Sequence, residues 1–142
     1  MVTDDAELKR ILQGTKVIAS VGVSGSAERP SHWIFYYLRR QGYEMYPVNP
    51  TAEQVQGLKA YPNLSALPRA VDVVQVFRRP EDVMPVVDEA VRVGARLVWM
   101  QKGIVNHEAA ARAEAAGLQV VMDRCMMETH ERLLGGIFSF DP

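Results

Sequence analysis

The sequence predicts an α/β fold in which one doubly wound parallel sheet makes up a single domain. Short runs of apolar and β-branched residues recur along the chain, and segments of helical pattern that end in glycine separate them. The runs are nearly continuous rather than alternating, which is typical of parallel strands covered on both faces. A length of 142 residues suits one domain, and no repeat, low-complexity stretch or linker divides residues 1–142.

Five runs predict the main strands, and a sixth strand is expected at the edge. The segment 50–71 is irregular, because Gly57, Pro62 and Pro68 interrupt it, and only residues 58–61 suit a brief strand there. Since crossovers between parallel strands are right-handed, we expect a Rossmann-type sheet with the strand order 3-2-1-4-5-6. The strands are expected at KVIASV 16–21, EMYPV 44–48, 58–61, DVVQVF 72–77, RLVWM 96–100 and QVVM 119–122.

Start and stop signals predict the helices between these strands. Asp4 and Glu7 have the spacing of a capping box, Pro30 and Ser31 favour a helix start, and Asn106 can cap the helix that follows it. Pro85 is expected to break or tighten the first turn of its helix. The helices are expected from about residue 3 or 4 to 14, and over 31–41, 81–93, 107–116 and 128–134.

The expected strand order places a ligand crevice at one edge of the sheet. The chain reverses direction between the strands 16–21 and 72–77, and ligands of such folds bind at the carboxyl ends of the strands beside that reversal. The loops 22–31, 48–51, 77–80 and 101–106 should meet there.

The loop after the first strand is built of small residues, Gly22, Val23, Ser24, Gly25 and Ser26. Such residues let the backbone approach a phosphate, whose charge the N-terminus of the next helix favours. The alternative is that a strand-to-helix turn simply requires small residues. The dinucleotide fingerprint fits poorly, because Ser24 and Ala27 stand at its second and third glycines. Asn49 also stands where an NAD site usually has an acid. An NAD(P)-binding enzyme or redox sensor therefore stays an alternative.

Two further loops bring polar or cationic groups to this edge. Arg78 and Arg79 follow the fourth strand, and a guanidinium suits phosphate oxygens; alternatively they are solvated or pair with Glu81 and Asp82. Phe77 offers an apolar wall, unless it belongs to the core. Gln101 and Lys102 add an amide and a point charge after the fifth strand, although Lys102 also suits an ordinary surface position.

Composition excludes several classes of function. Sixteen basic and seventeen acidic residues nearly balance, so we expect no nucleic-acid partner and a local anion site. No apolar run is long enough to span a bilayer, and the acidic start does not suit a secretion signal, so we expect no membrane partner and a cytoplasmic location. One cysteine and three scattered histidines predict no metal site. Cys125 is either an inert buried residue or a thiol near the crevice, and no catalytic residues can be assigned.

Five motifs in order resemble the small stand-alone CoA-binding domain proteins, over about residues 16–130. They are VGVS, YPVNP, VDVVQVFRRPEDV, WMQKGIVNHEAAARAEAAG and VVMDRC. That family is similar to the CoA-binding domain of the succinyl-CoA ligase alpha subunit, which has the same Rossmann architecture. The resemblance implies that Ser24, Gly25 and Ser26 hold phosphate and that Val48 and Asn49 border the nucleotide. It also implies that Met100, Gln101 and Lys102 contact the cofactor, with Phe77, Arg78 and Arg79 joining them by position.

The function implied by the resemblance is the binding of coenzyme A or an acyl-CoA, without catalysis by this chain alone. The ligase carries its phosphorylated histidine in a following domain, and this sequence contains no such domain. A further alternative is a CoA-binding subunit that works with an ATP-using partner chain. The acyl group, the protein partner and the oligomeric state stay open.

Overall fold

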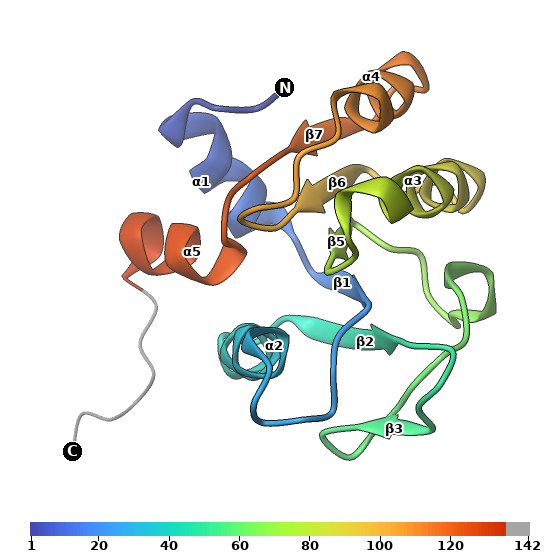
Figure 1. The fold of residues 1–142 in the computed structure, drawn as a ribbon. Coiled ribbons are helices and arrows are strands. Elements are labelled where there is room, and N and C mark those ends of the chain that lie inside the picture. The colour runs from blue at the N-terminus through green and yellow to red at the C-terminus, as the bar shows by residue number, and fades with distance from the viewer. Residues whose placement is uncertain (136–142) are drawn as a thin grey trace.

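A computed structural model describes residues 1–135 and contains a five-stranded parallel sheet, shown in Figure 1. The strands lie in the order β2-β1-β5-β6-β7, so the predicted α/β class and the relative order of the five main strands are confirmed. Ile18 in β1, which lies between β2 and β5, pairs with Met45 on one side and Val73 on the other. The strand bounds are β1 Val17–Val21, β2 Glu44–Val48, β5 Val73–Val76, β6 Leu97–Met100 and β7 Gln119–Val121.

The expectation of a sixth strand in the main sheet is wrong. Residues Gln54–Val55 (β3) and Leu58–Lys59 (β4) instead form a separate antiparallel pair. Gln56 and Gly57 both have positive φ, at 52° and 78°, and turn the chain back on itself. Only Tyr61 joins β2, through one parallel bridge to Val48, and Pro62 has no N–H with which to extend the pairing.

The helices agree with the expected segments, and the starts of α3 and α5 are each shifted by two residues. Residues Pro80–Asp82 form a 3₁₀ turn, so α3 begins at Val83 and Pro85 lies in its first turn, where an N–H has no helical acceptor. Helix α5 begins at Met126, two residues earlier than expected. The helices are α1 Asp5–Gly14, α2 Pro30–Arg40, α3 Val83–Arg92, α4 His107–Ala115 and α5 Met126–Leu134, with a 3₁₀ turn at Leu64–Ala66.

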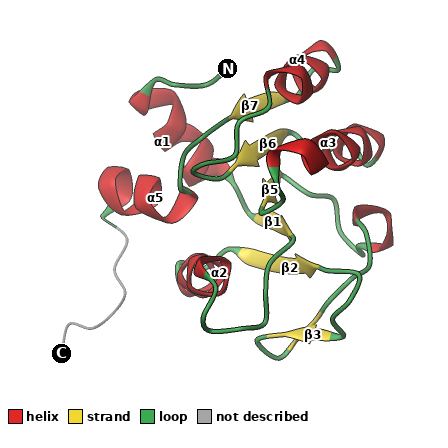
Figure 2. Cartoon of the chain, in the orientation of Figure 1, coloured by secondary structure: helices red, strands yellow, loops and turns green. Residues whose placement is uncertain are grey.

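Helices cover both faces of the sheet, as Figure 2 shows. Val17, Ala19 and Val21 of β1 pack into the core that α3 and α4 cover. Ile18 and the fully buried Trp99 pack into the second core, with α1, α2 and α5. Because successive side chains of a strand enter opposite cores, most positions are apolar on both faces, which explains the nearly continuous runs in the sequence.

Within residues 1–135, the longest apolar helical stretches fall short of what crossing a membrane requires.

Candidate functional site

A cleft of about 500 Å³ opens between the carboxyl ends of β1 and β5, at the edge where a crevice was predicted. We call it the loop cleft, because the loops after β1, β2, β5 and β6 all contribute to its wall. Its lining consists of Gly22, Ser24, Arg29, Pro30, Ser31, Asn49, Phe77, Arg78, Arg79, Pro80 and Ile104.

Gly22 forms the point at which three strand ends meet. Its φ is +89°, and a Cβ at this position would lie 2.4 Å from the carbonyl oxygen of Phe77, a distance that no side chain tolerates. Its N–H donates to the carbonyl of Val48 at 2.9 Å. The glycine therefore allows the loops after β1 and β5 to approach each other, which fixes the floor of the loop cleft.

Hydrogen bonds between loops hold the rim of the loop cleft. The Ser24 N–H donates to the Ser31 hydroxyl at 3.0 Å, and the Asn49 amide donates to the carbonyl of Val23 at 3.1 Å. The Asn49 Oδ1 accepts from both the N–H and the hydroxyl of Thr51 at 2.9 Å. The Ser31 N–H, in the first turn of α2, makes no hydrogen bond within residues 1–135 and stays available to an acceptor in the cleft.

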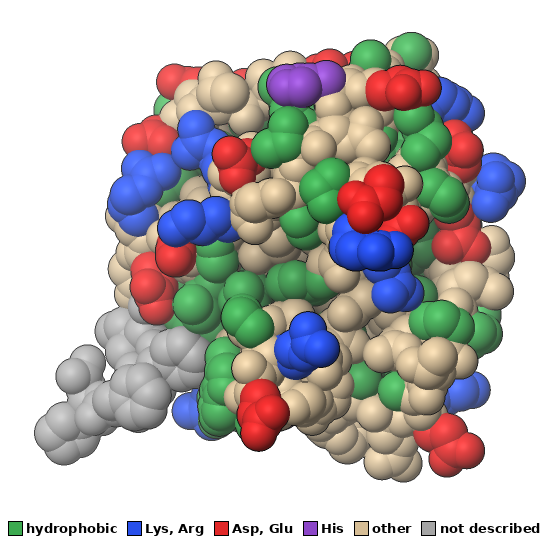
Figure 3. Space-filling model, in the orientation of Figure 1, with side chains coloured by type: hydrophobic (Ala, Val, Ile, Leu, Met, Phe, Trp, Pro, Cys, Tyr) green, Lys and Arg blue, Asp and Glu red, His purple; other side chains and the backbone are tan. Residues whose placement is uncertain are grey.

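The two adjacent arginines differ in their surroundings. The Arg79 side chain is 76% exposed and pairs with Asp82 at 3.1 Å and Glu81 at 3.5 Å. Arg78 is half-buried beside Gly22 and has no ion pair or hydrogen bond to any residue in 1–135. Figure 3 shows acidic and basic side chains interspersed over the face it presents. Arg78 is therefore a local source of positive charge in the loop cleft.

A second cleft, of about 300 Å³, continues from the first. Both clefts are lined by Pro30, Phe77 and Ile104, so these three residues form the passage between them. We call the second one the side cleft; Ile34, Gln101, Lys102, Cys125 and Glu128 complete its lining. The two clefts together thus have Arg78 in one part and an apolar passage leading into the other.

Gln101 ends a buried chain of polar side chains that crosses the sheet. Its Oε1 accepts from the Met126 N–H at 3.1 Å and from the Gln75 amide at 3.2 Å, while the Ser20 hydroxyl donates to Gln75 at 2.6 Å. Because a backbone N–H can only donate, the Met126 contact fixes Oε1 as the acceptor. The Gln101 Nε2 is then left without an acceptor in residues 1–135, on a side chain that lines the side cleft.

The structure brings together only part of the expected site. Gly22, Ser24, Asn49, Phe77, Arg78 and Arg79 line the loop cleft, and Phe77, Gln101 and Lys102 line the side cleft. The side chains of Val23, Val48 and Met100 lie in the two cores instead, so only their backbone atoms can face a ligand. Gly25 and Ser26 are exposed on the loop outside both linings, and Lys102 points toward Glu128 at 3.7 Å.

Several lining residues were not predicted as site residues. The sequence marks Pro30 and Ser31 only as a helix start. A helix that starts at the predicted crevice also places its first residues in the wall, and this signal could have identified them. Ile104 and Glu128 carry no signal in the sequence, since an isolated apolar or acidic residue in a loop or helix is common. Among residues 1–135, no group of three or more His, Cys, Asp or Glu side chains is placed to hold a metal ion.

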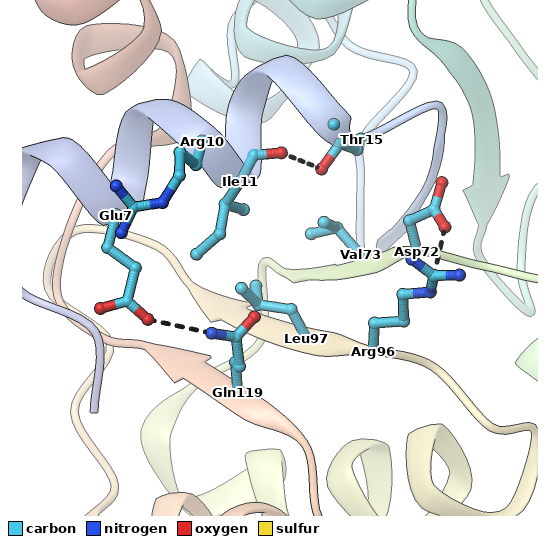
Figure 4. Close-up of a pocket in the computed structure, with 10 residues that line it drawn as sticks. Glu7, Arg10, Ile11, Thr15, Asp72, Val73, Arg96, Leu97 and Gln119 are labelled. Carbon is cyan, nitrogen blue, oxygen red and sulfur yellow. Dashed lines mark hydrogen bonds and ion pairs between the residues drawn. The ribbon is translucent and has the colours of Figure 1, made fainter.

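A further cavity, of about 340 Å³, lies at the opposite edge of the sheet, beneath α1 (Figure 4). Its polar groups largely satisfy each other: Gln119 donates to Glu7 at 3.1 Å, and Arg96 lies 3.8 Å from Asp72. Asp72 also accepts from the N–H groups of Lys16 and Val17 at 2.9 Å. These contacts join the amino ends of the strands, so the polar residues there have a structural role.

Comparison with known proteins relates the whole fold to a family. Residues 16–131 match the family model described as the CoA binding domain. A Bacillus subtilis protein, YneT, is 40% identical over 125 residues, which is 88% of this chain and 93% of that protein. A solved structure of a Pyrococcus horikoshii OT3 protein is 43% identical, covers 94% of both chains and superposes with a TM-score of 0.92.

Ligases that act on CoA contain a related segment. The ADP-forming acetate–CoA ligase II of Archaeoglobus fulgidus is 32% identical over 72 residues, which is 49% of this chain but only 10% of the ligase. The chain thus corresponds to a small part of that enzyme. Together with the match over residues 16–131 and the agreement in fold, these relationships identify the chain as a member of the CoA binding domain family.

Proposed function

We propose that the chain binds coenzyme A or an acyl-CoA along the loop cleft and the side cleft. The observation that carries this proposal is Arg78, a half-buried guanidinium without a partner among residues 1–135, beside the Gly22 turn and the first turn of α2. An arginine in such a place, with no internal acid beside it, has its donors free to bind an external anion.

The groove offers complementary groups to the successive parts of CoA. Arg78 and the unpaired N–H of Ser31 suit the diphosphate, and Asn49 at the rim borders the nucleotide. Phe77, Pro30 and Ile104 give an apolar passage that suits the pantetheine arm. A nearly neutral chain suffices for this, because Arg78 and the Ser31 N–H supply donors directly to the diphosphate.

NAD(P) fits the same cleft less well. An NAD site presents a carboxylate to the ribose hydroxyls, and no Asp or Glu belongs to the lining of the loop cleft. Asn49 cannot easily take that role, because its amide and carbonyl are both engaged with loop atoms.

The chain is proposed to hold its ligand without turning it over. No nucleophile and base pair was assigned from the sequence, and the two clefts add none in direct contact. A second candidate function is that of a CoA-binding subunit serving an ATP-using partner, which the match to the ADP-forming acetate–CoA ligase favours.

Calorimetric titration under reducing conditions tests the proposed ligand. CoA should bind and raise the melting temperature, since at a hundredfold excess over Kd it stabilises the fold by about 2.7 kcal/mol. NAD should bind at least about tenfold more weakly, for lack of a ribose-binding acid. Equal or tighter binding of NAD, or no binding of CoA, would contradict the proposal.

A further inference from the structure

We propose that Cys125 exchanges with CoA disulfides bound in the groove, so that the chain captures CoA as a reversible mixed disulfide. This inference rests on the proposed function and adds a covalent modification site to it. Cys125 is the one cysteine of the chain and is 7% exposed, at the wall of the side cleft.

Cys125 lies where two hollows meet. Besides the side cleft, it lines a pocket of about 270 Å³ together with Lys102, Arg124 and Arg132. Lys102 and Glu128 line both hollows together with Cys125, so the two hollows adjoin at the cysteine. A disulfide ligand can therefore place one half in the groove and its other half in this pocket.

The free amide of Gln101 is an independent sign that the side cleft receives a polar ligand. The side chain is 4% exposed, its Oε1 is used twice, and its Nε2 has no acceptor among residues 1–135. That nitrogen is not one of the fully buried side-chain atoms without a partner, so it is open to the side cleft and can donate to an acceptor there. The pantetheine arm carries two amide carbonyls, which are the acceptors that this donor lacks.

The groups along the groove occur in the same order as the chemical parts of CoA. Arg78 lies in the loop cleft, Phe77 and Ile104 form the apolar passage, and Gln101 and Cys125 follow in the side cleft. CoA presents its diphosphate first, then the branched apolar part of pantetheine, then its amides, and finally its thiol. With the diphosphate at Arg78, the sulfur end is directed toward Cys125.

Helix α5 also favours reaction at this cysteine. Cys125 is the N-cap residue, yet its side chain makes no capping hydrogen bond, a role for which Ser, Thr, Asp and Asn are the usual residues. The Cys125 sulfur is therefore not engaged in capping the helix and is left available for exchange.

The reaction is a thiol–disulfide exchange and needs no other oxidant. The Cys125 sulfur loses its proton and attacks the CoA sulfur of a bound disulfide CoA–S–S–R. A Cys125–S–S–CoA bond forms as the original S–S bond breaks, and R–S⁻ leaves with the electron pair and takes up a proton. One disulfide bond is exchanged for another, so there is no net oxidation or reduction.

The test follows adduct formation by intact-protein mass spectrometry. The full chain is mixed with CoA disulfide or, at equal concentration, with glutathione disulfide, which carries no nucleotide. Binding in the groove should make the CoA reaction faster by at least about tenfold, because it raises the local concentration of the disulfide. In urea the two rates should become similar. Cys125→Ser should fold, since serine caps helices well, and form no adduct.

The outcomes separate this inference from the proposed function. If CoA binds in the reducing titration but the two disulfides modify the native chain at equal rates, the inference is overturned and the proposed function stands. If CoA fails to bind in that titration, the proposed function falls and the inference falls with it.

Discussion

Arg78 and Arg79 are neighbours in sequence but differ in what surrounds them. Arg79 is exposed and pairs with Glu81 and Asp82, whereas Arg78 is half-buried in the loop cleft without a partner in residues 1–135. We therefore predict that Arg78→Ala weakens CoA binding about tenfold to a hundredfold, the loss of a charge-assisted hydrogen bond worth roughly 1.5–3 kcal/mol. Arg79→Ala should change Kd by less than about threefold, as an exposed pair contributes little.

Arg39 and Arg40 provide the matched control for that titration. Both are exposed at the far end of α2, where Arg39 donates to the carbonyl of Gln56 at 3.2 Å. Their double change to Ala removes more charge than Arg78→Ala but should alter Kd only through screened long-range attraction. Stronger loss of binding in this control, or in Arg79→Ala, would place the anion site elsewhere.

Side-chain direction limited what the sequence could predict about individual residues. Gly22 was identifiable, because a strand that turns sharply toward a helix requires a glycine. Val48 and Met100 close their strands and point into the α3–α4 core, while the next residues, Asn49 and Gln101, line the clefts. Side chains alternate between the two faces of a strand, and this alternation determines which of the last residues faces the core. In a run that is apolar throughout, the sequence does not show which face the last side chain takes.

Helices α2 and α5 meet through a buried polar contact. The Tyr37 hydroxyl lies 2.8 Å from Nδ1 of His130, which is 6% exposed. The Tyr43 ring lies edge-on to the imidazole at 5.8 Å, and burial raises the pKa of Tyr43 to about 12. Burial also lowers the pKa of His130, because desolvation disfavours the imidazolium form. The fold therefore holds this histidine neutral.

This contact predicts how stability depends on pH. An unfolded histidine titrates near pH 6.5, and the folded His130 titrates lower, so below about pH 6.5 the unfolded chain binds the extra proton. Stability should be constant with respect to this group above about pH 7 and fall as the pH drops toward 5. Urea unfolding at pH 7.5 and 5.5 should show a smaller loss in His130→Gln than in the parent chain, with His32 and His107 retained in both. An equal loss of stability in both proteins would show that protonation of His130 does not cause the pH dependence.

Whole elements were easier to predict than their ends. The five main strands are recognisable because both of their faces are buried. The edge segment 58–61 was misjudged because strand propensity does not reveal that Gln56 and Gly57 reverse the chain. Helix α5 starts two residues earlier than expected. Its N-cap is Cys125, which is not one of the usual capping residues, so the sequence carries no signal for this start.

At the scale of the whole molecule, charge and fold together make the anion site local. The formal net charge is −1, so long-range attraction of a ligand with several phosphates is absent. The parallel sheet compensates by gathering four loops, the first turn of α2 and Arg78 at one edge. The cavity at the opposite edge has comparable size, but its polar residues are largely paired with each other.

Amide chemical-shift mapping during titration with CoA tests most directly whether the carboxyl edge of the sheet is the binding site. The largest shifts should occur at Gly22, Ser24, Ser31 and Arg78, with progressively smaller ones toward α5. The amides around the opposite cavity, among them Gly14 and Arg96, should stay unchanged. Shifts concentrated at that opposite cavity, with the loop cleft unaffected, would contradict the account.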